Sequence, residues 1–167
     1  TLCNFTNHSY FNLDGTKNIA NHNLIVNCDN VLPVDTNGIP SSKPVSTKEL
    51  DLDFKKSRKL NDNGEPTEID HNFCISNTRQ SLRANAIVSA RNISLELLST
   101  EPGLQIYTGK GLDSGNEKGW ESFPYKEFAG IALEPQIWPD SPNQISFPNP
   151  YLSPHEKYKH HTRIKFS

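Results

Sequence analysis

The stretch Ala86-Ile87-Val88-Ser89-Ala90-Arg91-Asn92-Ile93-Ser94-Leu95-Glu96-Leu97 decides the fold class. On each side of Arg91-Asn92, apolar residues occupy every second position, and alternate side chains of a β-strand point to the same face. The short polar pair between the two runs indicates a tight hairpin. The segment therefore predicts two antiparallel strands, each with one face directed towards a core.

The same period of two recurs along the chain, at Leu24/Val26/Cys28, Leu50/Leu52/Phe54, Leu104/Ile106, Ile131/Leu133 and Ile164/Phe166. No stretch keeps a 3.6-residue period over three turns, as a helix would. Turn-forming pairs separate the predicted strands: Asp14-Gly15, Asn37-Gly38, Asn63-Gly64, Pro102-Gly103 and Ser114-Gly115. We therefore predict an all-β protein, most simply an antiparallel β-sandwich.

Two segments are predicted to be long loops. Residues 55–68 are polar and mixed in charge, and residues 135–157 contain six prolines. Proline cannot donate to a sheet ladder, so the second segment is expected at an edge or in a loop. Its aromatic residues Trp138, Phe147 and Tyr151 indicate that it packs as an ordered wall.

Composition narrows the function classes. The 167 residues include 17 Lys and Arg against 19 Asp and Glu, a net charge of −2, which argues against nucleic acid as a partner. No run approaches the apolar length of a membrane span. The cysteines Cys3, Cys28 and Cys74 form no CxxC pair, which favours reduced thiols in a cytoplasmic protein and argues against a zinc site. Met is absent, which fits either a trimmed N-terminus or a piece of a longer protein.

Glu134 is the first candidate for chemistry. In an extended Gly130–Gln136 segment, Ile131 and Leu133 face one way, whereas Ala132 and Glu134 face the other. Small residues beside a carboxylate leave room for a ligand. The alternative is an ordinary sandwich strand with a solvated outer face.

His8 is the second candidate. Asn4, Thr6, His8, Tyr10 and Asn12 share a face if their strand is regular, and Phe5, Phe11 and Leu13 share the other. Such a face offers many directional donors and acceptors, which polyol ligands such as sugars require. The alternative is a structural histidine on a polar surface.

Asp70 and Gln105 complete the set of candidates. Asp70 in Asp70-His71-Asn72-Phe73 can accept hydrogen bonds from sugar hydroxyls, and its alternative is a turn-forming residue. Gln105 shares a strand face with Tyr107, and its alternative is an exposed strand surface. His155, His160 and His161 have no metal-ligand spacing, so no metal site is expected.

Four motifs together resemble the aldose 1-epimerase (mutarotase) family. They are Thr6-Asn7-His8-Ser9-Tyr10-Phe11-Asn12-Leu13, Asp70-His71-Asn72-Phe73, Thr100-Glu101-Pro102-Gly103-Leu104-Gln105-Ile106-Tyr107-Thr108-Gly109, and Leu133-Glu134-Pro135-Gln136 followed by Pro139-Asp140-Ser141-Pro142-Asn143. Their order and spacing match the family across residues 1–167.

The resemblance implies a β-sandwich of the galactose-mutarotase supersandwich type and an isomerase that interconverts the α and β anomers of aldohexoses without a cofactor. It implies that Glu134 is the general base and His8 the general acid, and that Asp70 and Gln105 bind the sugar. A carboxylate can take the proton of the anomeric hydroxyl while an imidazolium donates one to the ring oxygen. We expect Glu134 and His8 to face each other across a cleft one pyranose wide.

The family is about twice as long as this chain. We therefore expect residues 1–167 to be the C-terminal part of a single epimerase-like domain, an incomplete sandwich whose missing N-terminal half is its partner beside the sugar. Two other functions stay open: a carbohydrate-binding module without catalysis, and a hexose-6-phosphate 1-epimerase, which needs basic residues near C6 of the sugar.

Overall fold

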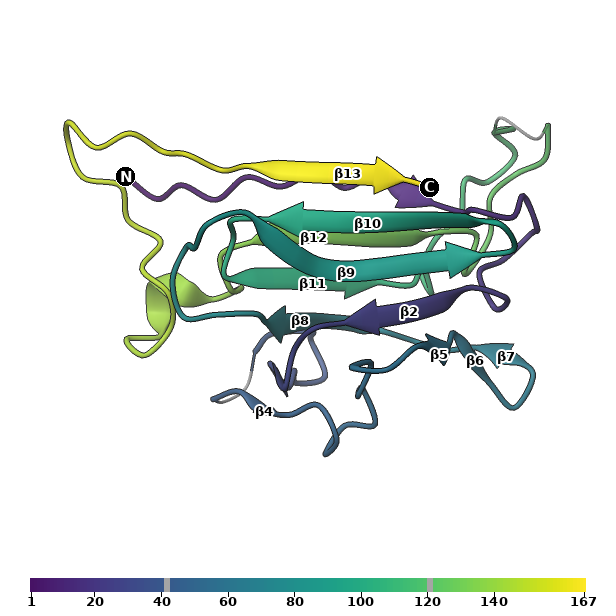
Figure 1. Ribbon diagram of the computed structural model, residues 1–167, viewed down its shortest axis with the longest axis horizontal. Coiled ribbons are helices and arrows are strands. Elements are labelled where there is room, and N and C mark those ends of the chain that lie inside the picture. Colours follow the sequence, from purple (N-terminus) through teal and green to yellow (C-terminus); the bar gives the residue numbers. More distant parts are fainter. Residues whose placement is uncertain (41–42, 120–121) are drawn as a thin grey trace.

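The chain folds into two large antiparallel β-sheets that lie one over the other and a separate two-stranded sheet, in a computed structural model that describes residues 1–40, 43–119 and 122–167 (Figure 1). The six-stranded sheet has the order β1 (Tyr10–Phe11), β12 (Ile131–Gln136), β11 (Gly103–Tyr107), β8 (Asp70–Cys74), β3 (Asn30–Val31) and β4 (Val45–Ser46). The five-stranded sheet has the order β13 (Thr162–Phe166), β10 (Ile93–Ser99), β9 (Arg83–Ala90), β2 (Asn23–Val26) and β5 (Arg58–Lys59). The predicted all-β sandwich is confirmed.

The β9–β10 hairpin forms where the alternating sequence predicts it. Ala90 pairs with Ile93, and Arg91 in the turn between them adopts a left-handed φ of 52°. Val88 and Leu95 are partners and fully buried, whereas Ser89 and Ser94 point the other way. One face of the hairpin therefore closes the core.

The core lies between the two sheets. Apolar side chains of both sheets meet there, among them Leu24, Val88, Leu95 and Leu97 from one sheet and Phe73, Leu104, Ile106, Ile131 and Leu133 from the other. Burial of these side chains is the main stabilising term of the sandwich. It also orients the six-stranded sheet, because residues next to the core positions must point outwards.

Two predictions about single segments are wrong. Leu50, Leu52 and Phe54 do not form a strand: residues 47–51 are turn, and Asp51 has a φ of 55°. Leu52 and Phe54 are nevertheless buried, so their spacing reflects burial from a loop. Residues 55–68 are not one loop, since they contain β5 and the small hairpin of β6 (Asn61–Asp62) and β7 (Glu65–Pro66).

Pro135 departs from the prediction because it lies inside β12, opposite Leu104 of β11. The other edge of β12 is paired with β1 only at Ile131 and Ala132. Pro135 therefore lies where one side of the strand has lost its neighbour, and a missing N–H there breaks no ladder bond. The rest of the proline-rich segment packs as expected, with Trp138 and Phe147 buried against each other at 5.2 Å between ring centroids.

The described residues contain almost no helix, and their three cysteines form no disulfide. A 3-10 helix, η1 (Ser141–Asn143), is the only helix among the described residues, and it is far too short to cross a membrane. Cys3, Cys28 and Cys74 are free thiols, as predicted. Burial raises the pKa of Cys28 to about 11, so this thiol stays protonated at neutral pH.

Candidate active site

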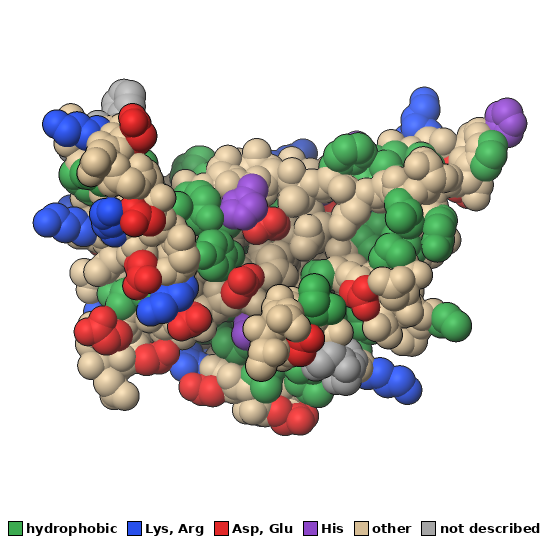
Figure 2. All heavy atoms as spheres, turned by 180° about the vertical axis from the view of Figure 1, so that it is seen from behind, with side chains coloured by type: hydrophobic (Ala, Val, Ile, Leu, Met, Phe, Trp, Pro, Cys, Tyr) green, Lys and Arg blue, Asp and Glu red, His purple; other side chains and the backbone are tan. Residues whose placement is uncertain are grey.

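Strand pairing places the predicted site residues in two rows on the outer face of the six-stranded sheet. Residues that lie opposite each other in a ladder point to the same face. Gln105 is opposite Glu134 in β12 and opposite Asn72 in β8. Two residues further along β11, Tyr107 is opposite both Ala132 of β12 and Asp70 of β8. In the view from behind in Figure 2, a histidine lies among acidic and hydrophobic side chains near the middle of the molecule.

His8 meets Glu134 at this face. Tyr10 pairs with Ala132, and the two segments run antiparallel. His8, two residues before Tyr10, therefore comes opposite Glu134, two residues after Ala132. The two side chains touch, with 3.3 Å between His8 Nε2 and Glu134 Oε1. The predicted partnership is therefore present in space, but the predicted sugar-wide cleft between the two groups is wrong in this arrangement.

Glu134 is the more enclosed member of the pair. Its side chain is 11% exposed, whereas that of His8 is 51% exposed. Burial raises the pKa of Glu134, the nearby charge of His8 opposes this, and Asp70 adds to the rise. A carboxylate with a raised pKa is a stronger base than an ordinary glutamate, because it holds a proton more tightly.

Asp70 and Gln105 form a second pair beside the first. Gln105 Nε2 donates to Asp70 Oδ1 at 2.7 Å, and both side chains reach solvent. The Asp70 carboxylate and the Gln105 amide oxygen retain further capacity to accept hydrogen bonds. All four predicted site residues thus share one face of one sheet.

Two tyrosines flank the acid–base pair. The Tyr10 ring lies 5.1 Å from the His8 ring, and Tyr107 lies 6.2 Å from Tyr10 and 6.5 Å from His8, between centroids. The Tyr107 hydroxyl accepts from the backbone N–H of Gly111 at 2.7 Å. Burial, followed by the nearby Tyr107 and Glu134, raises the pKa of Tyr10, so its phenol stays protonated. The two tyrosine rings and the His8 imidazole therefore form one cluster of three neighbouring rings.

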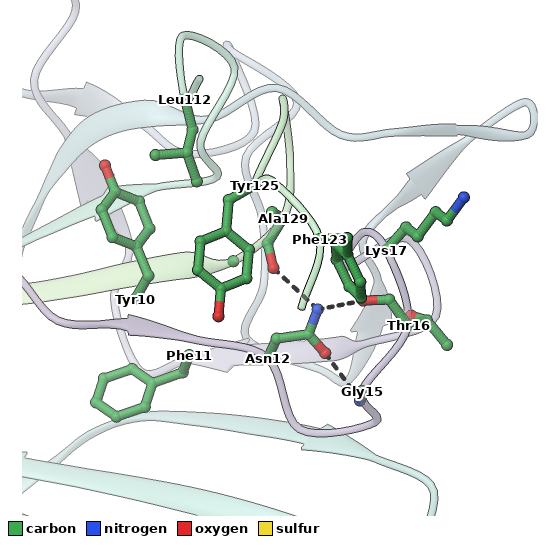
Figure 3. Close-up of a pocket in the computed structure, with 11 residues that line it drawn as sticks. Tyr10, Phe11, Asn12, Gly15, Thr16, Lys17, Leu112, Phe123, Tyr125 and Ala129 are labelled. Atoms are coloured by element: carbon green, nitrogen blue, oxygen red, sulfur yellow. Dashed lines mark hydrogen bonds between the residues drawn. The ribbon is translucent and has the colours of Figure 1, made fainter. Parts of the chain in front are cut away.

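A cavity of about 320 Å³ adjoins the site at Tyr10 (Figure 3). Phe123, Tyr125 and Gly130 are among its other lining residues, but the four predicted site residues are not. Asn12 fixes the turn at its edge: the side-chain amide donates to the carbonyls of Thr16 and Ala129, at 2.8 and 2.9 Å. No local sequence pattern indicates this cavity, because its walls come from two segments that are far apart in the chain.

The N-terminal segment differs from the predicted regular strand. Only Tyr10–Phe11 is strand, and Phe5 is 65% exposed instead of joining the core. Phe11 and Leu13 pack against the core as predicted. Sequence reasoning also missed the contacts that hold this segment, which come from residues near position 158. Among the described residues, no group of three or more His, Cys, Asp or Glu side chains is arranged to hold a metal ion.

Fold and site together define the class: an antiparallel β-sandwich with a carboxylate–imidazole pair and sugar-type hydrogen-bonding groups on the outer face of one sheet. The Aldose 1-epimerase family model matches residues 1–165. This chain belongs to the aldose 1-epimerase family.

Individual relatives agree with this assignment. The chain is 39% identical to galactose mutarotase of Mus musculus over 173 residues and 38% identical to that of Homo sapiens, covering all of this chain and 50% of each relative. It is 34% identical to aldose 1-epimerase of Escherichia coli K12, with 98% and 50% covered. The chain thus spans about half the length of the curated relatives it matches.

Solved structures confirm the fold. A GalM/aldose epimerase homologue from C. elegans superposes with a TM-score of 0.88 at 28% identity, covering 99% of this chain and 51% of that one. Galactose 1-epimerase from Lactobacillus acidophilus superposes with a TM-score of 0.71 at 23% identity and supports the fold alone. The galactose-mutarotase type of sandwich, predicted from the motifs, is confirmed.

Proposed function

We propose that this chain supplies the acid–base pair of an aldose 1-epimerase, which interconverts the α and β anomers of aldohexoses such as galactose and glucose. Glu134 removes the proton of the C1 hydroxyl while protonated His8 donates a proton to the ring oxygen, and the C1–O5 bond breaks. Rotation about C1–C2 turns the other face of the aldehyde towards the returning hydroxyl. Ring closure then moves both protons back, so the two residues regain their starting states.

The contact between His8 and Glu134 carries this proposal. The two side chains lie 3.3 Å apart, so a candidate base and a candidate acid stand at the same place on the sheet face. The raised pKa of Glu134 brings the base nearer to neutral pH, where proton transfer is most efficient. Asp70 and Gln105 lie on the neighbouring strands, where they bind sugar hydroxyls and leave C1 free to rotate.

Polarimetry of freshly dissolved α-D-galactose tests the proposal, on residues 1–167 and on the full-length protein. Glu134→Gln is expected to lower turnover about 10²–10⁴-fold, the usual contribution of a general base. Sugar affinity should largely persist, because Gln keeps the size of the side chain. Glu127→Gln is the matched control, since Glu127 is an exposed carboxylate paired with Lys110 at 3.5 Å. Glu134→Gln with normal turnover would sink the assignment of the base, and galactose binding without any acceleration would indicate a binding module.

We also propose that residues 1–167 are the C-terminal part of one epimerase domain whose remaining half completes the sugar site. This rests on the half-length match to every relative described above. A cytoplasmic location is proposed from the three free thiols, because such a set is typical of reducing compartments.

A further inference from the structure

The segment that carries His8 has little support of its own. Residues 6–9 belong to no strand, and His8 is half exposed. Within the described parts of the chain, the backbone N–H groups of Asn7 and His8 have no hydrogen-bond partner. The segment is pinned downstream by the pairing of Tyr10 with Ala132, so its other end decides where His8 lies.

That other end is held at Phe5 by two side chains that precede β13. The backbone N–H of Phe5 donates to the Tyr158 hydroxyl at 3.3 Å, and the two rings pack edge to face at 5.5 Å. The Phe5 carbonyl lies 3.1 Å from His160 Nδ1, which must donate there because a carbonyl only accepts. His160 Nε2 lies 2.7 Å from the Thr162 hydroxyl, which holds the ring from its other side. Both backbone groups of Phe5 are therefore bound.

Tyr158 is in turn backed by an ion pair whose carboxylate is buried. The Arg79 guanidinium lies 4.5 Å above the Tyr158 ring, and Arg79 Nε donates to Glu101 Oε1 at 2.7 Å. Glu101 lies in the connection between β10 and β11 and is fully buried. A buried carboxylate is strongly unfavourable without its partner, so Arg79 is held in place and presents its flat face to the ring.

We propose that Tyr158, backed by Arg79 and Glu101, is a positioning residue that sets the His8 imidazole against Glu134. The inference rests on the proposed function, in which His8 is the acid. From Phe5 to His8 the chain is three residues long, about 10 Å when extended, so displacement of Phe5 moves the imidazole. Asp70, Gln105 and Glu134 lie on strands of the sheet and do not depend on Tyr158.

Tyr158→Phe tests this role, because it keeps the ring and its stacking on Arg79 but removes the hydroxyl, which binds the Phe5 N–H and also interacts with Arg79. In the full-length enzyme we expect kcat to fall about tenfold and KM to stay within about twofold, since misplacement by about 1 Å can cost up to 10²-fold in rate. Tyr151→Phe is the matched control: Tyr151 is exposed and bridges Leu2 through its backbone only. Equal effects of the two variants, or a fall confined to kcat/KM through KM, would overturn the proposal.

A double-mutant cycle with His8→Asn shows whether the effect passes through His8. Tyr158→Phe should lower the residual rate of His8→Asn by less than twofold, because the group it positions is gone. A further tenfold fall in that background would assign Tyr158 a role in general stability and overturn the proposal.

An activity-independent measurement keeps the proposal separate from the proposed function. In NMR spectra of the chain, nuclear Overhauser contacts between the His8 and Tyr10 rings, 5.1 Å apart, should weaken in Tyr158→Phe and persist in Tyr151→Phe. His160→Asn provides a second variant that releases Phe5 from its other side and should have the same effect. Unchanged ring contacts in both variants would overturn the positioning role even if the enzyme proves active.

Discussion

Glu134 and His8 touch each other, yet they are held by different kinds of structure. Glu134 lies within β12, between the buried residues Leu133 and Pro135, and is paired with Gln105 on the neighbouring strand. His8 lies two residues before a two-residue strand, on a segment held by single side-chain contacts. The exposed fractions of the two side chains, 11% and 51%, follow from this difference.

The comparison shows which partner can move. A pyranose cannot fit between two groups 3.3 Å apart, so sugar binding between them requires one to shift. Displacing the backbone at Glu134 would break ladder bonds between β11 and β12, whereas displacing the backbone at His8 breaks none. Under the proposed function, we therefore expect Glu134 to stay fixed and His8 to adapt when a sugar binds between them.

Amide hydrogen exchange gives the largest expected difference between the two regions. The Ala132 and Leu133 amides should exchange only through opening of the sheet, at a free energy approaching the global stability of about 5–15 kcal/mol. Asn7 and His8 amides should open at nearly zero cost, because no acceptor in the described residues binds them. Protection of Asn7 and His8 as strong as that of Leu133 would show that the segment is as rigid as the sheet.

Gly103→Ala should destabilise the sheet that carries Glu134. A Cβ at Gly103 would lie 2.5 Å from Asn72 Oδ1, 2.8 Å from Trp138 Cδ1 and 3.0 Å from the Gln136 carbonyl. We expect a loss of about 1–3 kcal/mol in the free energy of unfolding, measured in urea, because this position is overpacked. In the control Gly111→Ala, the Cβ would meet only the Tyr107 hydroxyl at 3.1 Å, and a smaller loss is expected. Equal losses would mean that the sheet around Gln136 yields easily.

His22→Gln has the smallest expected effect and concerns the chain just after β1. His22 is fully buried, and its Nε2 accepts from the Leu13 N–H at 2.8 Å. Burial lowers the pKa of His22, and Asp14 opposes the shift. Below about pH 6.5, His22 therefore binds a proton in the unfolded chain but not yet in the folded chain, so folding stability falls as the pH falls.

Gln can accept from Leu13 without titrating, so His22→Gln should make the free energy of unfolding less dependent on pH between 7.5 and 5.5. Urea titrations at both pH values measure this. His155→Gln, at an exposed histidine, serves as the control and should keep the wild-type dependence. An identical dependence in His22→Gln would show that the bond to Leu13 does not depend on the charge of His22.

The sequence predicted the parts of the molecule that follow from local periodicity. Alternation identified β9, β10, β11 and β12, and the same alternation put Glu134 and Gln105 on an outer face. It failed at Leu50, Leu52 and Phe54, because burial from a turn gives the same spacing as a strand. It failed again at Phe5, where an extended segment has no core to face.

What the sequence by itself determined is the all-β class and the epimerase motifs, which contain the four candidate site residues, because these depend on neighbours within a few positions. Only the tertiary structure decided that His8 touches Glu134, that Phe5 is held by Tyr158, and that a buried Glu101 lies behind that contact. These contacts join residues more than 100 positions apart, or charges whose burial depends on how two sheets pack. Local periodicity carries no information about such distances, so they follow only from the packed sandwich.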